Sequence, residues 1–173
     1  MGALILIAGA NGSGKSRFAE ELIGRTAGKR WYIATMVPQT ADNYSRIEKH
    51  RRQREHLGFF TLEISAAVGD AAVSQRDVVL LEDVSNLLAN VMFEHGGDAA
   101  AVCRDIFRLA SRCRLLAAVT IDGLRPEAYE AETARYAAAL SEVNERLFEQ
   151  ASAVVKMSGG IPRWIKGSSR CIT

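Results

Sequence analysis

The sequence of 173 residues has little cysteine, no long apolar run and almost no excess charge of either sign. Its three cysteines are odd in number and match no metal or redox spacing, which indicates free thiols in a reducing cytoplasm. No apolar run reaches the ~20 residues of a membrane-spanning helix, and the first residues lack the basic start of a secretory signal. The formal net charge of +2 implies no general affinity for nucleic acid. We therefore expect a cytoplasmic protein with no membrane span and no nucleic-acid partner.

Short apolar runs alternate with helical patterns along the chain, and its length fits a single domain of residues 1–173. Strands are predicted at 3–8, 30–35, 59–63, 77–83 and 114–121, and a terminal β-hairpin at 152–166. Helices are predicted at 15–26, 41–58, 84–93, 98–112 and 126–151, the last of them beginning at Pro126. Because the strands are unbroken apolar runs, they indicate a mostly parallel sheet that is covered on both faces.

The segment "GANGSGKS" fits the phosphate-loop pattern G-x-x-x-x-G-K-[ST] and lies between a predicted strand and a predicted helix. Its residues are Gly9, Ala10, Asn11, Gly12, Ser13, Gly14, Lys15 and Ser16. Glycines let backbone N–H groups converge on phosphate oxygens, and the helix start adds a positive dipole end. Lys15 is expected to contact the β- and γ-phosphates and Ser16 to bind Mg²⁺. The sequence thus predicts a doubly wound α/β fold of the P-loop NTPase type that binds a nucleoside triphosphate.

Acidic residues end the strand predicted at 77–83, where a P-loop enzyme needs a carboxylate near its metal. Glu82 follows the apolar run directly, and we assign it the role of metal ligand or of the group that acts on the acceptor. Asp83 could share the metal or could cap the helix that follows, and the sequence does not separate these two roles.

A basic segment, "RIEKHRRQR", places His50 among cations that include Arg51 and Arg54. One interpretation is a solvated helix face. The other is catalytic: nearby cations disfavour the protonated ring, which keeps the imidazole neutral and nucleophilic, while the cations bind the phosphates under attack. His56 and His95 lack this setting, and we interpret both as surface residues.

Taken together, these segments resemble the bifunctional adenosylcobinamide kinase / adenosylcobinamide-phosphate guanylyltransferase family of cobalamin biosynthesis. The similar stretches are "GSGKSRFAEELI", "WYIAT", "RIEKHRRQR", "LLEDVSNLLANVMFEHGG" and "VNERLFEQASAVVKMSGGIPRWIKG". The resemblance implies that a nucleoside triphosphate, ATP or GTP with Mg²⁺, phosphorylates adenosylcobinamide. It further implies that His50 accepts GMP from GTP and passes it to adenosylcobinamide phosphate, and that the protein is a homotrimer.

Two departures from the family pattern leave alternatives open. Family members usually carry arginine at the position of Gly12, and a Gly-Ile-Val-Pro element in the region that here reads "IDGLRPEAYEAE". Ligands of such folds bind at loops that follow parallel strands, so this change bears on corrinoid binding. The alternatives are a P-loop small-molecule kinase with another acceptor, and a non-catalytic GTP-binding paralogue.

Overall fold

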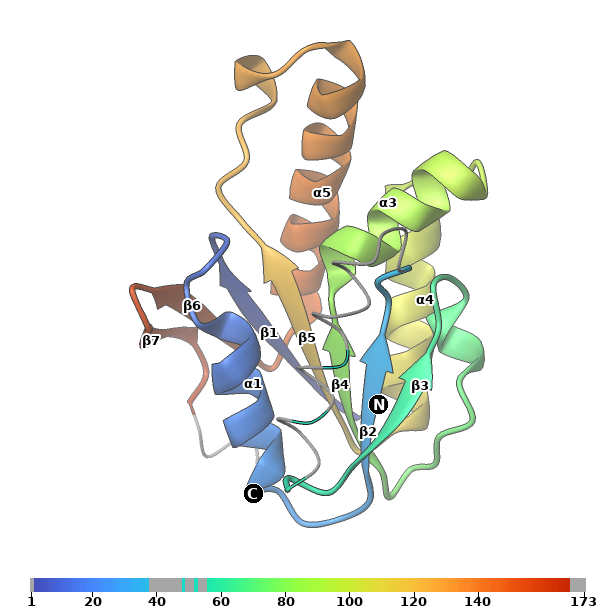
Figure 1. The fold of residues 1–173 in the computed structure, drawn as a ribbon, viewed down its shortest axis with the longest axis vertical. Coiled ribbons are helices and arrows are strands. Elements are labelled where there is room, and N and C mark those ends of the chain that lie inside the picture. Colours follow the sequence, from blue (N-terminus) through green and yellow to red (C-terminus); the bar gives the residue numbers. More distant parts are fainter. Residues whose placement is uncertain (1, 38–47, 49–51, 53–55, 169–173) are drawn as a thin grey trace.

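The computed structural model describes residues 2–37, 48, 52 and 56–168, and its centre is a seven-stranded sheet (Figure 1). The strands are β1 (Ala3–Gly9), β2 (Arg30–Ala34), β3 (Phe59–Glu63), β4 (Val78–Glu82), β5 (Leu115–Ile121), β6 (Ala153–Ser158) and β7 (Ile161–Lys166). Their order across the sheet is β3-β2-β4-β5-β1-β6-β7. All neighbours pair in parallel except β6 and β7, which form an antiparallel hairpin. The predicted α/β class, mostly parallel sheet and C-terminal hairpin are confirmed.

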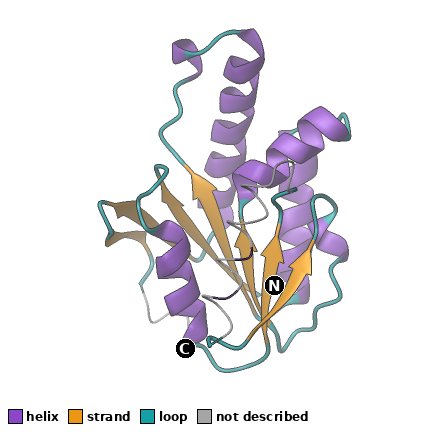
Figure 2. Cartoon of the chain, viewed as in Figure 1, coloured by secondary structure: helices purple, strands orange, loops and turns teal. Residues whose placement is uncertain are grey.

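Helices cover both faces of this sheet (Figure 2). They are α1 (Lys15–Gly24), α3 (Val84–Glu94), α4 (Ala99–Arg112) and α5 (Ala131–Gln150). Helix α1 lies on one face and buries Ala19 and Ile23 there, whereas α3, α4 and α5 pack on the other face. Within the described part of the chain, no helix is long and apolar enough to cross a membrane.

The strands are unbroken apolar runs because both of their faces are buried. In β1, Leu4 and Leu6 join the core beneath α3, α4 and α5, whereas Ile5 and Ile7 join the core beneath α1. Successive side chains of a strand point to opposite faces, so one strand serves two cores. This burial fixes β1, and with it the loop that follows at its carboxyl end.

The start of the long helix was predicted wrongly. Pro126 begins a separate 3-10 turn, η2 (Pro126–Ala128), and the backbone of Tyr129 and Glu130 is extended before α5 begins at Ala131. The chain between Asp122 and Glu130 therefore forms an irregular connection above the sheet rather than a first helical turn. Helix α5 itself buries Leu140 and its periodic neighbours, as its pattern predicts.

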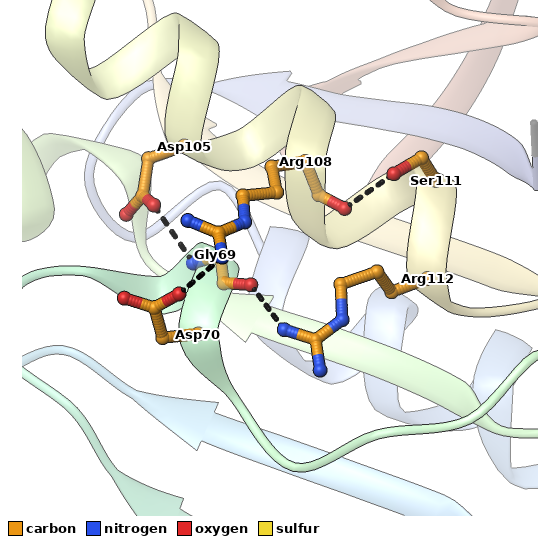
Figure 3. A network of polar contacts seen from close by, with 6 residues as sticks. All are labelled: Gly69, Asp70, Asp105, Arg108, Ser111 and Arg112. Carbon is orange, nitrogen blue, oxygen red and sulfur yellow. Dashed lines mark hydrogen bonds and ion pairs between the residues drawn. The ribbon is translucent and has the colours of Figure 1, made fainter.

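A polar network holds the connection between β3 and β4 against α4 (Figure 3). The Gly69 N–H donates to Asp105 Oδ1 at 2.9 Å, and Arg112 donates to the Gly69 carbonyl at 2.7 Å. Arg108 pairs with Asp70 at 2.8 Å. A Cβ at Gly69 would lie 2.5 Å from Asp105 Oδ1, so glycine permits this close approach. The network fixes the middle of the connection that leads to β4 (Val78–Glu82), the strand that carries the predicted acid.

Candidate functional site

The phosphate loop, residues 9–16, leaves β1 and turns directly into α1 as predicted. Gly14 is the N-cap residue of α1 and has a φ of 87°, a conformation that residues with a side chain rarely adopt. At Gly9, a Cβ would lie 2.5 Å from Ser13 Oγ and 2.8 Å from the Met157 carbonyl oxygen. These glycines let the backbone turn tightly, with the first N–H groups of α1 available to an anion.

The turn of the β6–β7 hairpin lies against the phosphate loop. The Gly160 N–H donates to the Ser13 carbonyl at 3.1 Å, and a Cβ at Gly14 would lie 3.4 Å from Gly160 Cα. Two stretches almost 150 positions apart in the chain are therefore in contact here. The turn of the hairpin thus packs against the phosphate loop and supports it.

Lys15 lies over the phosphate loop. Its side chain is only 6% exposed, and Nζ donates to the Ala10 carbonyl oxygen at 3.2 Å. An ammonium group that bonds to a loop carbonyl is close to the position in which it would meet phosphate oxygens. Contact of Lys15 with the β- and γ-phosphates stays a prediction.

The side chains of Ser16 and Glu82 are in direct contact although they belong to separate elements. Ser16 Oγ donates to Glu82 Oε1 at 2.5 Å, although the two residues are 66 positions apart in the chain. Ser16 belongs to the first turn of α1 and Glu82 ends β4, and β5 lies between β4 and the β1 strand that leads into the loop. The contact brings together the two residues that were predicted to hold Mg²⁺.

Two buried oxygens have no hydrogen-bond partner within the described residues: Glu82 Oε2, and Ser13 Oγ in the phosphate loop. Burial raises the pKa of Glu82 to about 8, and the neighbouring Asp83 adds to the rise, while the hydrogen bond from Ser16 opposes it. Polar atoms buried without partners cost free energy, so their presence indicates a site shaped for a ligand that supplies the missing interactions.

The Ser16 hydroxyl and the Glu82 carboxylate are oxygen ligands of the kind that Mg²⁺ binds. Magnesium prefers hard oxygen ligands, and it usually takes one or two protein ligands and completes its shell with water and substrate phosphates. Ser16 and Glu82 supply a hydroxyl and a carboxylate. No group of three or more His, Cys, Asp or Glu side chains in the described ranges could hold a metal by itself.

Asp83 caps α3, which is one of its two predicted roles. Its side chain accepts from the Asn86 N–H at 2.7 Å and from Ser85 Oγ at 2.5 Å. Both acceptor bonds use Oδ1, and they satisfy donors at the start of the helix. Glu82 is the carboxylate that contacts the phosphate loop, through the hydrogen bond that it accepts from Ser16.

Thr35 is a site residue that the sequence analysis did not identify. It is fully buried just beyond β2, and its hydroxyl oxygen contacts three backbone groups of the strand end that carries the acid. Thr35 Oγ1 lies 3.1 Å from the Glu82 carbonyl oxygen and 2.8 Å from the Asp83 carbonyl oxygen, and it accepts from the Asp83 N–H at 2.9 Å. Thr35 therefore holds the backbone from which the Glu82 carboxylate projects.

Asn90, on α3, joins the ends of two strands. Its Nδ2 donates to the Thr35 carbonyl at 2.8 Å and to the Ser65 carbonyl at 3.0 Å, which lie just beyond β2 and β3. These two hydrogen bonds give both partly buried carbonyl groups a donor. The side chain thus fixes the point where the chain leaves β2 toward the basic segment.

His50, Arg51 and Arg54, the residues predicted to perform nucleotidyl transfer, lie outside the described residues. In the sequence, their basic segment begins at Arg46 and belongs to the connection that follows β2. His56 and His95 are both exposed, as predicted.

A family model described as CobU, cobinamide kinase / cobinamide phosphate guanyltransferase, matches residues 5–165. The bifunctional adenosylcobalamin biosynthesis protein CobU of Escherichia coli (strain K12) is 39% identical over 99 residues, which are 55% of this chain and 53% of that protein. The aligned stretch thus spans about half of the curated relative.

Two solved structures resemble the fold at low sequence identity. The ATP synthase subunit NeqB from Nanoarcheaum equitans is 11% identical with a TM-score of 0.51, over 91% of this chain and 45% of that one. A DnaB-like replicative helicase is 8% identical with a TM-score of 0.48, over 89% of this chain and 46% of that one. The first likeness supports the P-loop type of fold.

Proposed function

The chain belongs to the cobinamide kinase / cobinamide phosphate guanyltransferase family, and from this premise we propose that it acts in adenosylcobalamin biosynthesis as a bifunctional transferase. In the first reaction it phosphorylates adenosylcobinamide with ATP or GTP. In the second it transfers GMP from GTP to adenosylcobinamide phosphate and forms adenosylcobinamide-GDP. The observation that carries the proposal is the contact of Ser16 with Glu82 at 2.5 Å beside a complete phosphate loop.

In the kinase reaction, the oxygen of the acceptor's hydroxyl forms a bond to the γ-phosphorus, and the bond to the β-phosphate oxygen breaks. The nucleoside diphosphate leaves, and the hydroxyl proton passes to a base. Lys15 and the N–H groups of the loop bind the phosphates and offset the charge that develops on them. Mg²⁺, held by Ser16 and Glu82, would supply further charge neutralisation at the β- and γ-phosphates.

In the guanylyl transfer, a neutral ring nitrogen of His50 bonds to the α-phosphorus of GTP and pyrophosphate leaves. A phosphate oxygen of the phosphorylated acceptor then attacks the same phosphorus, and the bond to His50 breaks. Arg51 and Arg54 bind phosphate oxygens during both steps. The described chain leaves β2 with Thr35 in contact with the Glu82 backbone, and the connection that follows β2 in the sequence carries His50, which supports the proposal.

Labelling with α-³²P-GTP tests the guanylyl transfer. We expect the wild-type protein to acquire an acid-labile label that adenosylcobinamide phosphate removes, and we expect His50→Ala to acquire none. The control is His56→Ala, because His56 is an exposed histidine in the same part of the chain. A label that persists in His50→Ala would exclude His50 as the nucleophile.

The kinase reaction is measured separately as nucleoside diphosphate release that depends on adenosylcobinamide. Turnover with this acceptor but no protein label would indicate a kinase alone, and GTP binding without either reaction would indicate a non-catalytic paralogue. We further propose a homotrimer, for which light scattering would give three times the chain mass of 18.9 kDa.

A further inference from the structure

A groove of about 590 Å³ lies on the face of the sheet opposite α1, bounded by α5, β1, β6 and the β7 strand. Leu6, Leu140 and Val154 form a buried apolar floor. Phe148 and Ile165 flank the groove and leave 41% and 47% of their surface exposed. Cavities of a few hundred Å³ with an apolar floor and a few polar groups are typical of small-molecule sites.

One end of the groove adjoins the phosphate loop. Ala8, which lines it, directly precedes Gly9, and the Asp122 N–H donates to the Gly9 carbonyl at 3.3 Å. Lys156 pairs with Asp122 at 3.1 Å and thereby links β6 to the loop that follows β5. This end of the groove is thus built from residues whose backbone continues into the nucleotide site.

The polar rim of the groove is mainly acidic. Glu145 and Glu149 project from the exposed side of α5, with Ser141 one turn before Glu145. The Ser141 hydroxyl lies 3.4 Å from Glu145 Oε1, a long contact that a better donor could replace. The Asn144 amide already bonds to Thr120 Oγ1 and to the Ile121 carbonyl, so it serves the protein itself. The groove therefore offers apolar surface and hydrogen-bond acceptors to a ligand, with Lys156 already paired.

We propose that this groove binds one edge of the corrinoid acceptor. The inference rests on the proposed function, which makes cobinamide the substrate. A cobinamide has an apolar ring edge with methyl groups, amide side chains that donate hydrogen bonds, and a net positive charge at its cobalt centre. The floor packs against the ring edge, and the carboxylates of Glu145 and Glu149 accept from the amides and attract the cation. The aminopropanol arm then extends past Asp122 and Gly9 to the phosphates.

The loop that lines this groove includes Asp122, Gly123 and Leu124, and it lies in the region where the sequence departs from the family pattern. The acceptor site would thus be formed by a loop of its own sequence together with α5 and the hairpin.

The test is a substitution that fills the groove. Ser141→Trp places a large ring in it from an exposed position of α5, and Ala138→Trp, also exposed on α5 but outside the groove, is the matched control. Equilibrium dialysis of the full chain with adenosylcobinamide, read by corrinoid absorbance, gives the dissociation constant. We expect it to rise about tenfold or more for Ser141→Trp and to stay within about twofold for Ala138→Trp. Nucleotide binding is expected to be unchanged in both.

A second variant, Glu145→Gln combined with Glu149→Gln, tests the acidic rim without adding bulk. We expect the corrinoid to bind several-fold more weakly while the folded state, followed by circular dichroism, remains intact. Equal corrinoid binding by wild type and by folded Ser141→Trp overturns the inference and leaves the proposed function standing. A wild-type protein that neither binds nor phosphorylates the corrinoid overturns both.

Discussion

Replacing Glu82 by glutamine is expected to stabilise the nucleotide-free protein relative to the wild type, and this difference is expected to grow as the pH rises. Burial raises the pKa of Glu82 from 4.5 to about 8, so the folded state keeps a proton that the unfolded chain releases at lower pH. Stability from this group is therefore fully present below the unfolded pKa and falls as the pH rises toward the folded pKa. Glutamine is neutral at every pH and removes that dependence.

The magnitude follows from the difference between the two pKa values. At ~1.36 kcal/mol per pKa unit, the penalty carried by Glu82 grows by roughly 3 to 4 kcal/mol between pH 5 and pH 8. Glutamine can still accept the hydrogen bond from Ser16 Oγ that Glu82 Oε1 accepts at 2.5 Å. Its amide nitrogen takes the place of the unpartnered Oε2, at a cost of ~1–3 kcal/mol that does not vary with pH. The pH-dependent part thus isolates the ionisation of Glu82.

Urea unfolding without nucleotide or Mg²⁺, followed by tryptophan fluorescence at several pH values, measures both proteins. We expect the free energy of unfolding of Glu82→Gln to gain on the wild type by roughly 3 kcal/mol from pH 5 to pH 8. Glu63→Gln, which alters an exposed carboxylate at the end of β3, is the control and should change stability by no more than about 0.5 kcal/mol. Parallel pH curves for Glu82→Gln and wild type would refute the burial of an unsatisfied carboxyl group at this site.

Two further predictions concern the same site. Thr35→Val removes the hydroxyl that contacts the Glu82 and Asp83 backbone; it is expected to lower the free energy of unfolding by ~2 kcal/mol and to raise the Mg²⁺ concentration needed for half-maximal kinase activity. Thr35→Ser keeps the hydroxyl and should behave as wild type, so equal effects of valine and serine would contradict the positioning role. Lys15→Ala is expected to weaken nucleotide binding at least about tenfold in calorimetry, and unchanged affinity would remove Lys15 from the site.

Much of the fold could be predicted because its strands are continuous apolar runs. The segment "VVLL" can be buried on both faces only inside a covered sheet, and the glycine-rich loop with its flanking elements is a local pattern. The start of α5 could not be predicted in this way. Pro126 is a good first residue for a helix, but it is equally suited to the 3-10 turn that it begins, and residues 126–130 include none that is buried to hold a helical turn against the core.

The contacts that complete the site depend on strand order, which no local pattern encodes. Sequence alone placed Ser16 and Glu82 near one metal, but it did not show that β5 separates their strands. Thr35 ends an ordinary strand pattern, and its role appears only when β2 pairs with β4 and brings its hydroxyl to the Glu82 backbone. Asp83 was ambiguous because a helix cap and a metal ligand require the same side chain.

The Gly160 contact with the phosphate loop gives the edge hairpin a part in nucleotide binding. The Ser13 carbonyl is held in place by a turn that belongs to the last two strands, so the rigidity of the anion cradle depends on how firmly that turn is seated. A longer β6–β7 turn would free the carbonyl and loosen the cradle while the sheet remained intact. The hairpin thus stabilises the conformation of the phosphate loop. Lengthening its turn is expected to raise the nucleotide dissociation constant while the melting temperature stays nearly unchanged.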